Sequence, residues 1–178
     1  MLRVPLAKSY ITRPLKPLYG WTQTTPKGLM LDPAWDRSVD IWPGMVAMKT
    51  TGDLVTLVNA TGVPYGLFGN YIGGDGVDEL LDVNLNACAV WVLEADAEFI
   101  VQAPSFDDTL SWVDPGNGTF ALVSAYVSGT NRGKLCPTGT LHSSRAIAKL
   151  LRVDSPTQIV IGGLAPGDVA GAGGAATA

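Results

Sequence analysis

The first 31 residues limit most strongly what this chain can fold into. They contain five basic side chains and no acidic one, whereas the rest contains seven basic and sixteen acidic residues, so the two parts carry net charges of +5 and −9. Four prolines interrupt the basic part, at Pro5, Pro14, Pro17 and Pro26. Proline lacks a backbone donor, breaks helices and is confined to the edges of sheets. The segment therefore cannot form a helix or a central strand.

Large apolar and aromatic residues are interleaved with these charges. Two interpretations are open: an edge strand that covers the core of its own domain, or an extended arm that docks on a neighbouring protein. We favour the arm, because a basic segment on an acidic body is suited to lie along another surface. Its expected contact residues are Arg3, Lys8, Tyr10, Arg13, Lys16, Tyr19 and Trp21.

The remainder of the chain predicts an all-β fold. Short apolar runs alternate with turn residues, and the 178 residues include 21 Gly and 12 Pro. We expect a small β-barrel or sandwich over residues 32–161, between the extended arm at 1–31 and a flexible Gly/Ala-rich tail at 162–178. A tight connection is expected at 95–97, a helix of one or two turns is possible at 77–85, and 136–140 should form a loop. Strands are expected at 45–49, 54–58, 87–94, 98–102, 119–127, 143–153 and 158–161.

No apolar run approaches the roughly 20 residues that a membrane-spanning helix needs. Arg3 and Lys8 interrupt what would be the hydrophobic region of a signal peptide. We therefore expect no membrane partner and a protein that stays in the reducing compartment where it is made. Cys88 and Cys136 should then be free thiols, and the apolar run around Cys88 indicates burial.

Few residues are suited to catalysis or metal binding. His142 is the single histidine, and the two cysteines have no CxxC spacing, whereas zinc sites use several such ligands. A Cys136–His142 dyad is conceivable, but its spacing carries no mechanical meaning. The acidic residues at 75–82 are interpreted as a solvated turn, and the pair at 107–108 as turn residues. We expect no enzymatic activity, no metal and no cofactor.

The charge distribution argues against nucleic acid as a partner. The acidic body repels phosphate, and the basic residues of the arm are widely spaced and separated by prolines. A dense electrostatic footprint, as nucleic-acid-binding proteins have, is missing. The expected partner is therefore another protein.

Several short patterns together resemble the head decoration, or capsid cement, proteins of tailed bacteriophages. The resemblance covers roughly residues 27–161. The patterns that carry it are KGLMLDP at 27–33, PGMV at 43–46, GVPYGLF at 62–68, VWV at 90–92, DAEF at 96–99 and APSFD at 103–107.

This resemblance implies a structural protein made in the host bacterial cytoplasm and located on the outer capsid surface of the virion. It would bind the major capsid protein through the arm, stabilise contacts between capsid subunits and commonly form a homotrimer at three-fold positions. Trp91, Phe99 and Phe106 would lie in the barrel core. Trp35 and Trp42, on an irregular link, are expected at the contact between protomers or with the capsid.

Two other functions stay open. The first is a phage tail or host-receptor-binding β module, for which Trp112 on a loop-like segment could stack on a sugar. The second is a small β-fold hydrolase that uses His142.

Overall fold

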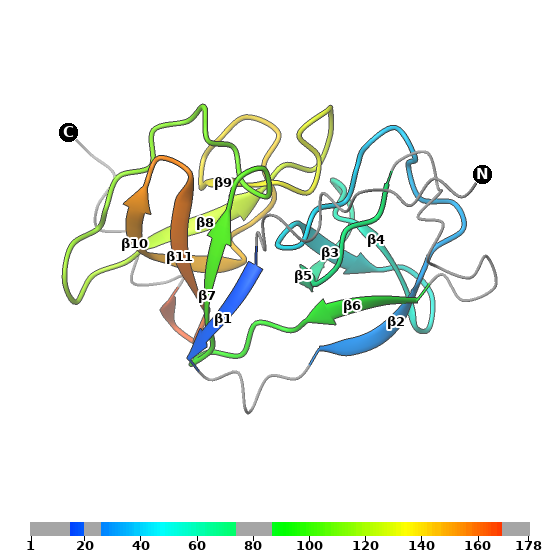
Figure 1. The fold of residues 1–178 in the computed structure, drawn as a ribbon, viewed down its shortest axis with the longest axis horizontal. Helices are drawn as coiled ribbons and strands as arrows, with labels where there is room; N and C mark the ends of the chain where they lie inside the picture. The colour runs from blue at the N-terminus through cyan, green and yellow to red at the C-terminus, as the bar shows by residue number, and fades with distance from the viewer. Residues whose placement is uncertain (1–14, 20–25, 74–86, 169–178) are drawn as a thin grey trace, which may run out of the picture.

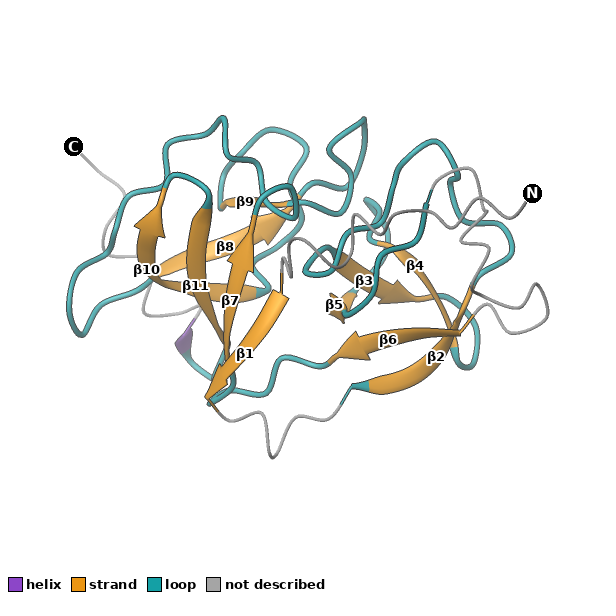
Figure 2. Ribbon diagram, viewed as in Figure 1, coloured by secondary structure: helices purple, strands orange, loops and turns teal. Residues whose placement is uncertain are grey.

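The computed structural model describes residues 15–19, 26–73 and 87–168, which form two β-rich lobes (Figures 1 and 2). In the view of Figure 1, a closed barrel lies on the right and a six-stranded sheet on the left. The prediction of an all-β fold with a small barrel is confirmed. Within the described ranges, no helix has the length and apolar character needed to span a bilayer.

The barrel consists of five short strands in the order β2-β4-β3-β5-β6, and the pairing of β6 with β2 closes it. β2 and β4 run parallel, whereas the other four pairs are antiparallel. The strands are β2 (Lys27–Leu31), β3 (Val46–Lys49), β4 (Leu54–Leu57), β5 (Pro64–Phe68) and β6 (Ala87–Trp91).

The barrel encloses a core of its own. In β2 the side chains alternate, so that Leu29 and Leu31 are buried while their neighbours are exposed, as expected for a strand with one face on a core. The irregular link before β3 adds Trp35, Ile41 and Met45 to the same cluster. Every member of this cluster lies between residues 29 and 90, so the barrel fills its interior with its own side chains.

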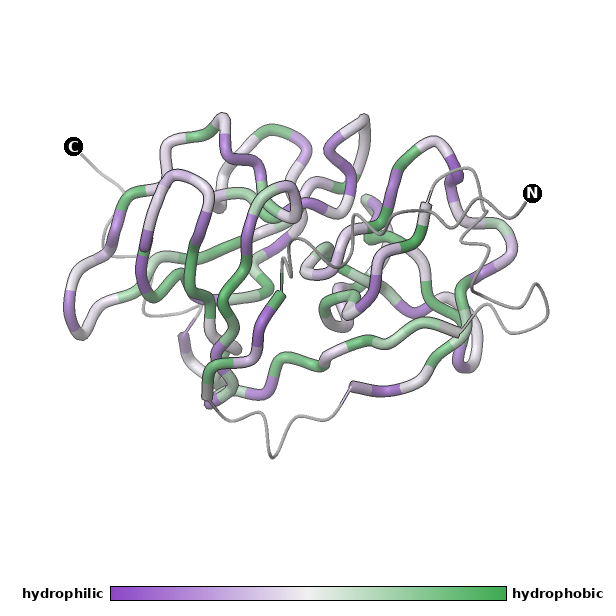
Figure 3. Tube along the Cα trace, viewed as in Figure 1, coloured by the Kyte–Doolittle hydropathy of each residue, from purple (hydrophilic) through white to green (hydrophobic). Residues whose placement is uncertain are grey.

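The six-stranded sheet is antiparallel throughout, in the order β1-β7-β11-β10-β8-β9. β10 and β11 form the predicted hairpin, and in Figure 3 β7 and β11 carry long hydrophobic stretches. The strands are β1 (Leu15–Tyr19), β7 (Glu98–Gln102), β8 (Ala121–Ala125), β9 (Leu135–Pro137), β10 (Ala148–Ser155) and β11 (Gln158–Gly163).

The segment that follows β7 contacts β9, the last strand at the other end of the sheet. The chain that continues from β7 reaches Phe106, which forms a parallel bridge with Leu135 of β9. The Leu135 amide donates to the Ser105 carbonyl at 3.0 Å, and the Asp107 amide donates to the Leu135 carbonyl at 3.0 Å. This bridge supplies partners for backbone groups of β9 that would otherwise lie on an open edge.

Backbone contacts join the two lobes closely. The Val46 amide donates to the Gly133 carbonyl at 2.8 Å, and the Ser105 hydroxyl donates to the Pro43 carbonyl at 2.6 Å. Gly133 has φ +86°, and a Cβ there would collide with the Leu57 side chain, so glycine is required both by conformation and by space. The loop that carries Gly133 can therefore lie directly on the end of β4.

The core of the sheet includes side chains from the barrel. Phe99, Val101 and Phe106 are fully or nearly fully buried in it, and Val46, Val58 and Leu67 from the barrel region pack into the same cluster. Trp91 at the end of β6 packs against Phe99, edge to face, with ring centroids 5.6 Å apart. Phe99 and Phe106 are thus core residues, but of the sheet and not of the barrel as expected.

Other local expectations need correction. The connection at 95–97 joins strands of two different sheets, because β6 belongs to the barrel and β7 pairs with β1 and β11. Residues 135–137 form a strand where a loop was expected from Cys136 onward. Gly162 and Gly163 belong to β11, since glycine leaves room for the close approach of the Glu94 carbonyl to Gly163. The possible helix at 77–85 lies outside the described residues.

Candidate functional site

The part of the predicted arm that the structure describes begins with an edge strand. β1 pairs with β7 on one side, from Leu15 beside Val101 to Tyr19 beside Glu98 (Figure 1). Its other side meets no strand in the part of the chain that the structure describes. Leu15 is buried in the sheet core, whereas Lys16 and Pro17 are exposed. Pro17 on an edge strand is where a residue without a backbone donor is tolerated.

This arrangement revises the expectation for residues 1–31. β1 completes the sheet and β2 is one of the five strands of the closed barrel, so this stretch does contribute strands to the folded body. The alternation of apolar and polar residues did not predict either strand, because each strand is short and β1 contains proline. Arg3, Lys8, Tyr10, Arg13 and Trp21 lie outside the described residues, and their role as capsid contacts stays a prediction together with that of Lys16 and Tyr19.

The two tryptophans of the link have different environments. Trp35 is 7% exposed and buried within the barrel core of its own chain. Its expected place at a contact between protomers or with the capsid stays a prediction. Trp42 is only partly buried, and its ring packs against Tyr71 with centroids 4.7 Å apart. The Tyr71 hydroxyl in turn donates to Asp40 at 3.1 Å. Trp42 keeps exposed surface, and its role in an interface stays a prediction.

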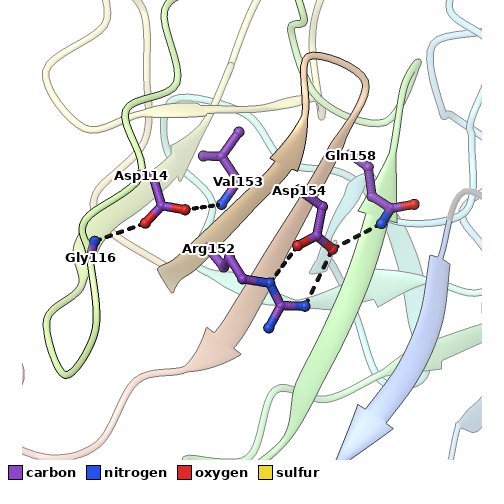
Figure 4. A network of polar contacts seen from close by, with 6 residues as sticks. All are labelled: Asp114, Gly116, Arg152, Val153, Asp154 and Gln158. Atoms are coloured by element: carbon purple, nitrogen blue, oxygen red, sulfur yellow. Dashed lines mark hydrogen bonds and ion pairs between the residues drawn. The ribbon is translucent and has the colours of Figure 1, made fainter.

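A polar network fixes one long loop to the edge of the sheet (Figure 4). The Asp114 carboxylate accepts hydrogen bonds from the Gly116 amide at 2.8 Å and from the Val153 amide at 3.1 Å. These two hydrogen bonds hold the pKa of Asp114 below its usual value. Val153 lies beyond the part of β10 that pairs with β8, so the carboxylate takes the place of a neighbouring strand.

Beside it, Arg152 and Asp154 form an ion pair on the exposed part of β10, and Gln158 donates to Asp154 at 2.9 Å (Figure 4). Gln102 of β7 donates to Gln158 at 2.8 Å, which extends the row across three strands. The hydrogen bond from Arg152 lowers the pKa of Asp154. The row is suited to stabilising the sheet, because all its charged groups have partners inside it.

Asp107 is a buried carboxylate whose hydrogen-bond partners belong to the sheet lobe. Burial alone would raise its pKa, but hydrogen bonds from Thr109 and from the Tyr126 hydroxyl, the latter at 2.7 Å, hold the pKa below the usual value. Burial, together with the same hydrogen bond, raises the pKa of Tyr126 to about 12. Asp108 is exposed. The pair therefore divides into one residue that organises the turn and one on the surface.

The residues considered for catalysis are not arranged as a reactive group. Cys88 and Cys136 are free thiols, as predicted, and both are buried, whereas burial was predicted for Cys88 alone. Burial raises the pKa of each to about 11, which disfavours the reactive thiolate. His142 is exposed in a turn with φ +61°. Within the described ranges, no three His, Cys, Asp or Glu side chains gather where they could hold a metal ion.

Trp112, which was considered for sugar stacking in a receptor-binding module, is partly buried against the core of the sheet lobe. Its ring packs edge to face on Phe106 with centroids 5.4 Å apart, and its indole nitrogen donates to the Asp107 carbonyl at 2.7 Å. Both contacts lie within the sheet lobe, and the ring keeps some exposed surface, so a stacking role stays a prediction.

Sequence reasoning missed an elongated hollow where the lobes meet, which we call the inter-lobe groove. It consists of two adjoining cavities of about 350 and 370 Å³ that share Arg145. Residues 59–66 of the barrel form one wall and residues 143–147 of the sheet form the other. Because these segments are about 80 positions apart in the chain, no local pattern could have brought them together.

A family model described as phage cement protein matches residues 1–178. The chain belongs to the phage cement protein family. The resemblance noted in the sequence is therefore confirmed, and membership extends to the arm and the tail as well as to the two lobes. Neither the curated proteins nor the solved structures contain a match. The family name describes a component of the phage capsid.

Proposed function

We propose that this protein binds the outside of a phage head and stabilises contacts between major capsid protein subunits. The observation that carries the proposal is the match of the whole chain to phage cement proteins. The arrangement of β1 supports it: the edge strand anchors the basic segment to the body through Leu15 and the pairing with β7, while Lys16 stays exposed. β1 thus holds the start of the described chain firmly on the body.

The proposed contact is electrostatic and apolar together. The arm residues Arg3, Lys8, Arg13 and Lys16 would face acidic groups of the capsid exterior, and the aromatic side chains of the arm would pack beside them. A protein that binds the assembled shell and not the separate subunits shifts the equilibrium towards the shell by mass action. No catalytic step is part of this function.

We further propose a homotrimer, because a three-fold site on a capsid is matched by a three-fold ligand. Trp42 is the candidate contact within it, since part of its ring surface stays exposed beside Tyr71. Analytical ultracentrifugation of the free protein measures the assembly directly. Trp42→Ala should lower the trimer fraction, and a wild-type protein that sediments as a monomer contradicts this part of the proposal.

Two truncations separate binding from folding. Removal of residues 1–14 should leave the circular dichroism spectrum and the melting temperature unchanged, because β1 keeps its pairing with β7. The same removal should weaken co-sedimentation with phage shells by about tenfold or more, equivalent to about 1.4 kcal/mol. Removal of residues 1–26 should also lower the melting temperature, because Leu15 leaves the core. Full shell occupancy by the shorter truncation overturns the role of the arm.

A further inference from the structure

Asn117 and Gly118 form the tip of the loop that Asp114 fixes to β10 (Figure 4). The chain reverses there through a hydrogen bond from the Thr119 amide to the Gly116 carbonyl at 3.3 Å, with Gly118 at φ +76°. Both tip residues are exposed, and a Cβ placed on Gly118 would meet no heavy atom within 4 Å. The backbone at the tip is therefore open to solvent and unobstructed.

The Asn117 side chain has no partner that would hold it away from this backbone. Its amide makes no hydrogen bond to any described residue, and neither does the backbone nitrogen of Gly118. That nitrogen and the side-chain carbonyl carbon of Asn117 are placed along the chain so that a bond between them closes a succinimide ring. A side chain on the second residue would shield the nitrogen, and glycine has none.

The other described asparagines are held in place and shielded. Asn59 accepts a hydrogen bond from a backbone amide at 2.8 Å, and Asn70 accepts one at 2.9 Å. Asn131 donates to the Asp107 carboxylate at 3.4 Å. All three are half-buried, and each is followed by a residue that carries a side chain. Asn117 therefore differs from them in exposure, in hydrogen bonding and in the residue that follows.

We propose that Asn117 is a site of spontaneous deamidation in the folded protein. The Gly118 nitrogen loses its proton to water or hydroxide and attacks the side-chain carbonyl carbon of Asn117, so that a C–N bond forms. The side-chain nitrogen takes up a proton and leaves as ammonia, and a succinimide remains. Water then opens the ring at either carbonyl carbon, which gives aspartate or isoaspartate. Water is the only co-reactant, and no oxidation or reduction occurs.

The reaction changes the loop beside its attachment to the sheet. Either product adds a negative charge close to Asp114, whose carboxylate accepts hydrogen bonds from the Gly116 and Val153 amides. Like charges at short range repel each other. Isoaspartate also adds a methylene to the backbone inside the turn that the Thr119 amide closes. The loop should therefore be held less firmly on β10 in molecules that have reacted.

Incubation of the full chain in mildly alkaline buffer tests the proposal without phage shells. Peptide mapping by mass spectrometry follows each asparagine, and an isoaspartate methyltransferase labels the isoaspartate product. The same incubation in urea gives the rate for the unfolded chain. Asn117 should react in the folded protein within about threefold of the unfolded rate, because an exposed tip needs no global unfolding. Asn59, Asn70 and Asn131 should stay unmodified in the folded protein over the same time.

Matched variants locate the reaction. Asn117→Gln should abolish the conversion over this time, since the longer side chain closes its ring far more slowly. Gly118→Ala should slow it by about tenfold or more, because the added Cβ shields the attacking nitrogen. Gly129→Ala is the control: Gly129 has φ +75° and equally open space, but it follows serine. It should leave the rate at Asn117 unchanged, and circular dichroism confirms that both alanine variants are folded.

Three outcomes overturn the proposal. The first is an unmodified Asn117 in the folded protein while the unfolded chain reacts, which would show that the native turn protects it. The second is modification of Asn131 at an equal rate, and the third is an unchanged rate in Gly118→Ala. Hydrogen-exchange mass spectrometry tests the consequence: amides of residues 114–119 should exchange faster after the reaction. Unchanged exchange there contradicts the weakened attachment of the loop.

Discussion

The two lobes fill their interiors in different ways. The barrel core draws all its members from residues 29–90, within the barrel and its own link. The sheet core contains Val46, Val58 and Leu67 from the barrel region, and Trp91 packs against it from β6. The barrel is therefore self-sufficient in packing, whereas the sheet uses the outer surface of the barrel as part of its core.

The two cores differ because the barrel is a closed sheet and the six-stranded sheet is open. Five strands that close on themselves surround a small interior that their own side chains can fill. A curled sheet of six strands leaves one face that needs cover, and the described part of this chain supplies no helix for that purpose. The neighbouring barrel takes this role through β3 and β5. A change that destabilises the barrel should therefore also destabilise the sheet, whereas a change that destabilises the sheet should affect the barrel less.

The largest expected effect comes from two matched core truncations. Phe68 lies in the barrel core and Phe99 in the sheet core, and both are fully buried. Each change to Ala should cost about 3–5 kcal/mol of unfolding free energy. Phe68→Ala should increase amide hydrogen exchange in both lobes, because Leu67 beside it covers the sheet. Phe99→Ala should increase exchange in the sheet and leave the barrel strands protected.

Hydrogen-exchange mass spectrometry on the full chain resolves the two lobes. Equal loss of protection in β2 and β4 by both variants would show that the lobes unfold as one unit. The asymmetry between the two cores would then have no thermodynamic consequence.

A smaller effect is expected at the joint between the lobes. Arg132 donates to the Leu57 carbonyl at 2.7 Å and to the Val58 carbonyl at 2.9 Å, at the end of β4. Arg132→Ala should lower the free energy of unfolding by about 1.5–3 kcal/mol, the range for hydrogen bonds that involve a charged group. Urea denaturation measures it. Arg37→Ala, at an exposed arginine, should stay within about 0.5 kcal/mol of wild type.

If Arg132→Ala instead splits the urea transition into two steps, the arginine couples the lobes in addition to stabilising them. A transition that stays single with an unchanged midpoint would mean that the two hydrogen bonds contribute no net stability.

The smallest effect is a pH dependence confined to the sheet lobe. The pKa of Asp107 is lowered in the folded protein, so its ionised form stabilises the fold above the unfolded-state pKa of about 3.9. This contribution is lost as the pH falls through the lowered value. Asp107→Asn should therefore lose less stability than wild type between about pH 4 and the acid limit, measured by urea midpoints at each pH.

Asp108→Asn removes the same charge from the exposed neighbour, which receives none of the hydrogen bonds of Asp107. If Asp108→Asn reduces the loss of stability at low pH as much as Asp107→Asn does, the effect comes from net charge and not from the buried network.

Local sequence determined the class of the fold and many of its strands. Alternating or apolar runs bounded by turn residues located β3, β4, β7 and the β10–β11 hairpin, since a strand with one buried face has a period of two that needs no tertiary information. The prolines of the first 31 residues predicted that no central strand forms there. Pro17 does lie on an edge strand, but β2, directly after Pro26, is paired on both sides in the closed barrel, so this prediction is wrong for Lys27–Leu31. The patterns from residue 27 to residue 107 also indicated the cement protein family, which the full-length match confirms.

Only the tertiary structure decided which strands share a sheet. β6 and β7 are separated by six residues yet belong to different lobes, whereas β2 pairs with β6 across more than fifty positions. Strand pairing depends on contacts between distant residues, and a short strand pattern says nothing about its partner. For the same reason, local sequence did not predict that Trp35 lies in the barrel core or that Trp112 packs on Phe106. It also did not predict that Arg145 and Tyr65 line the same cavity.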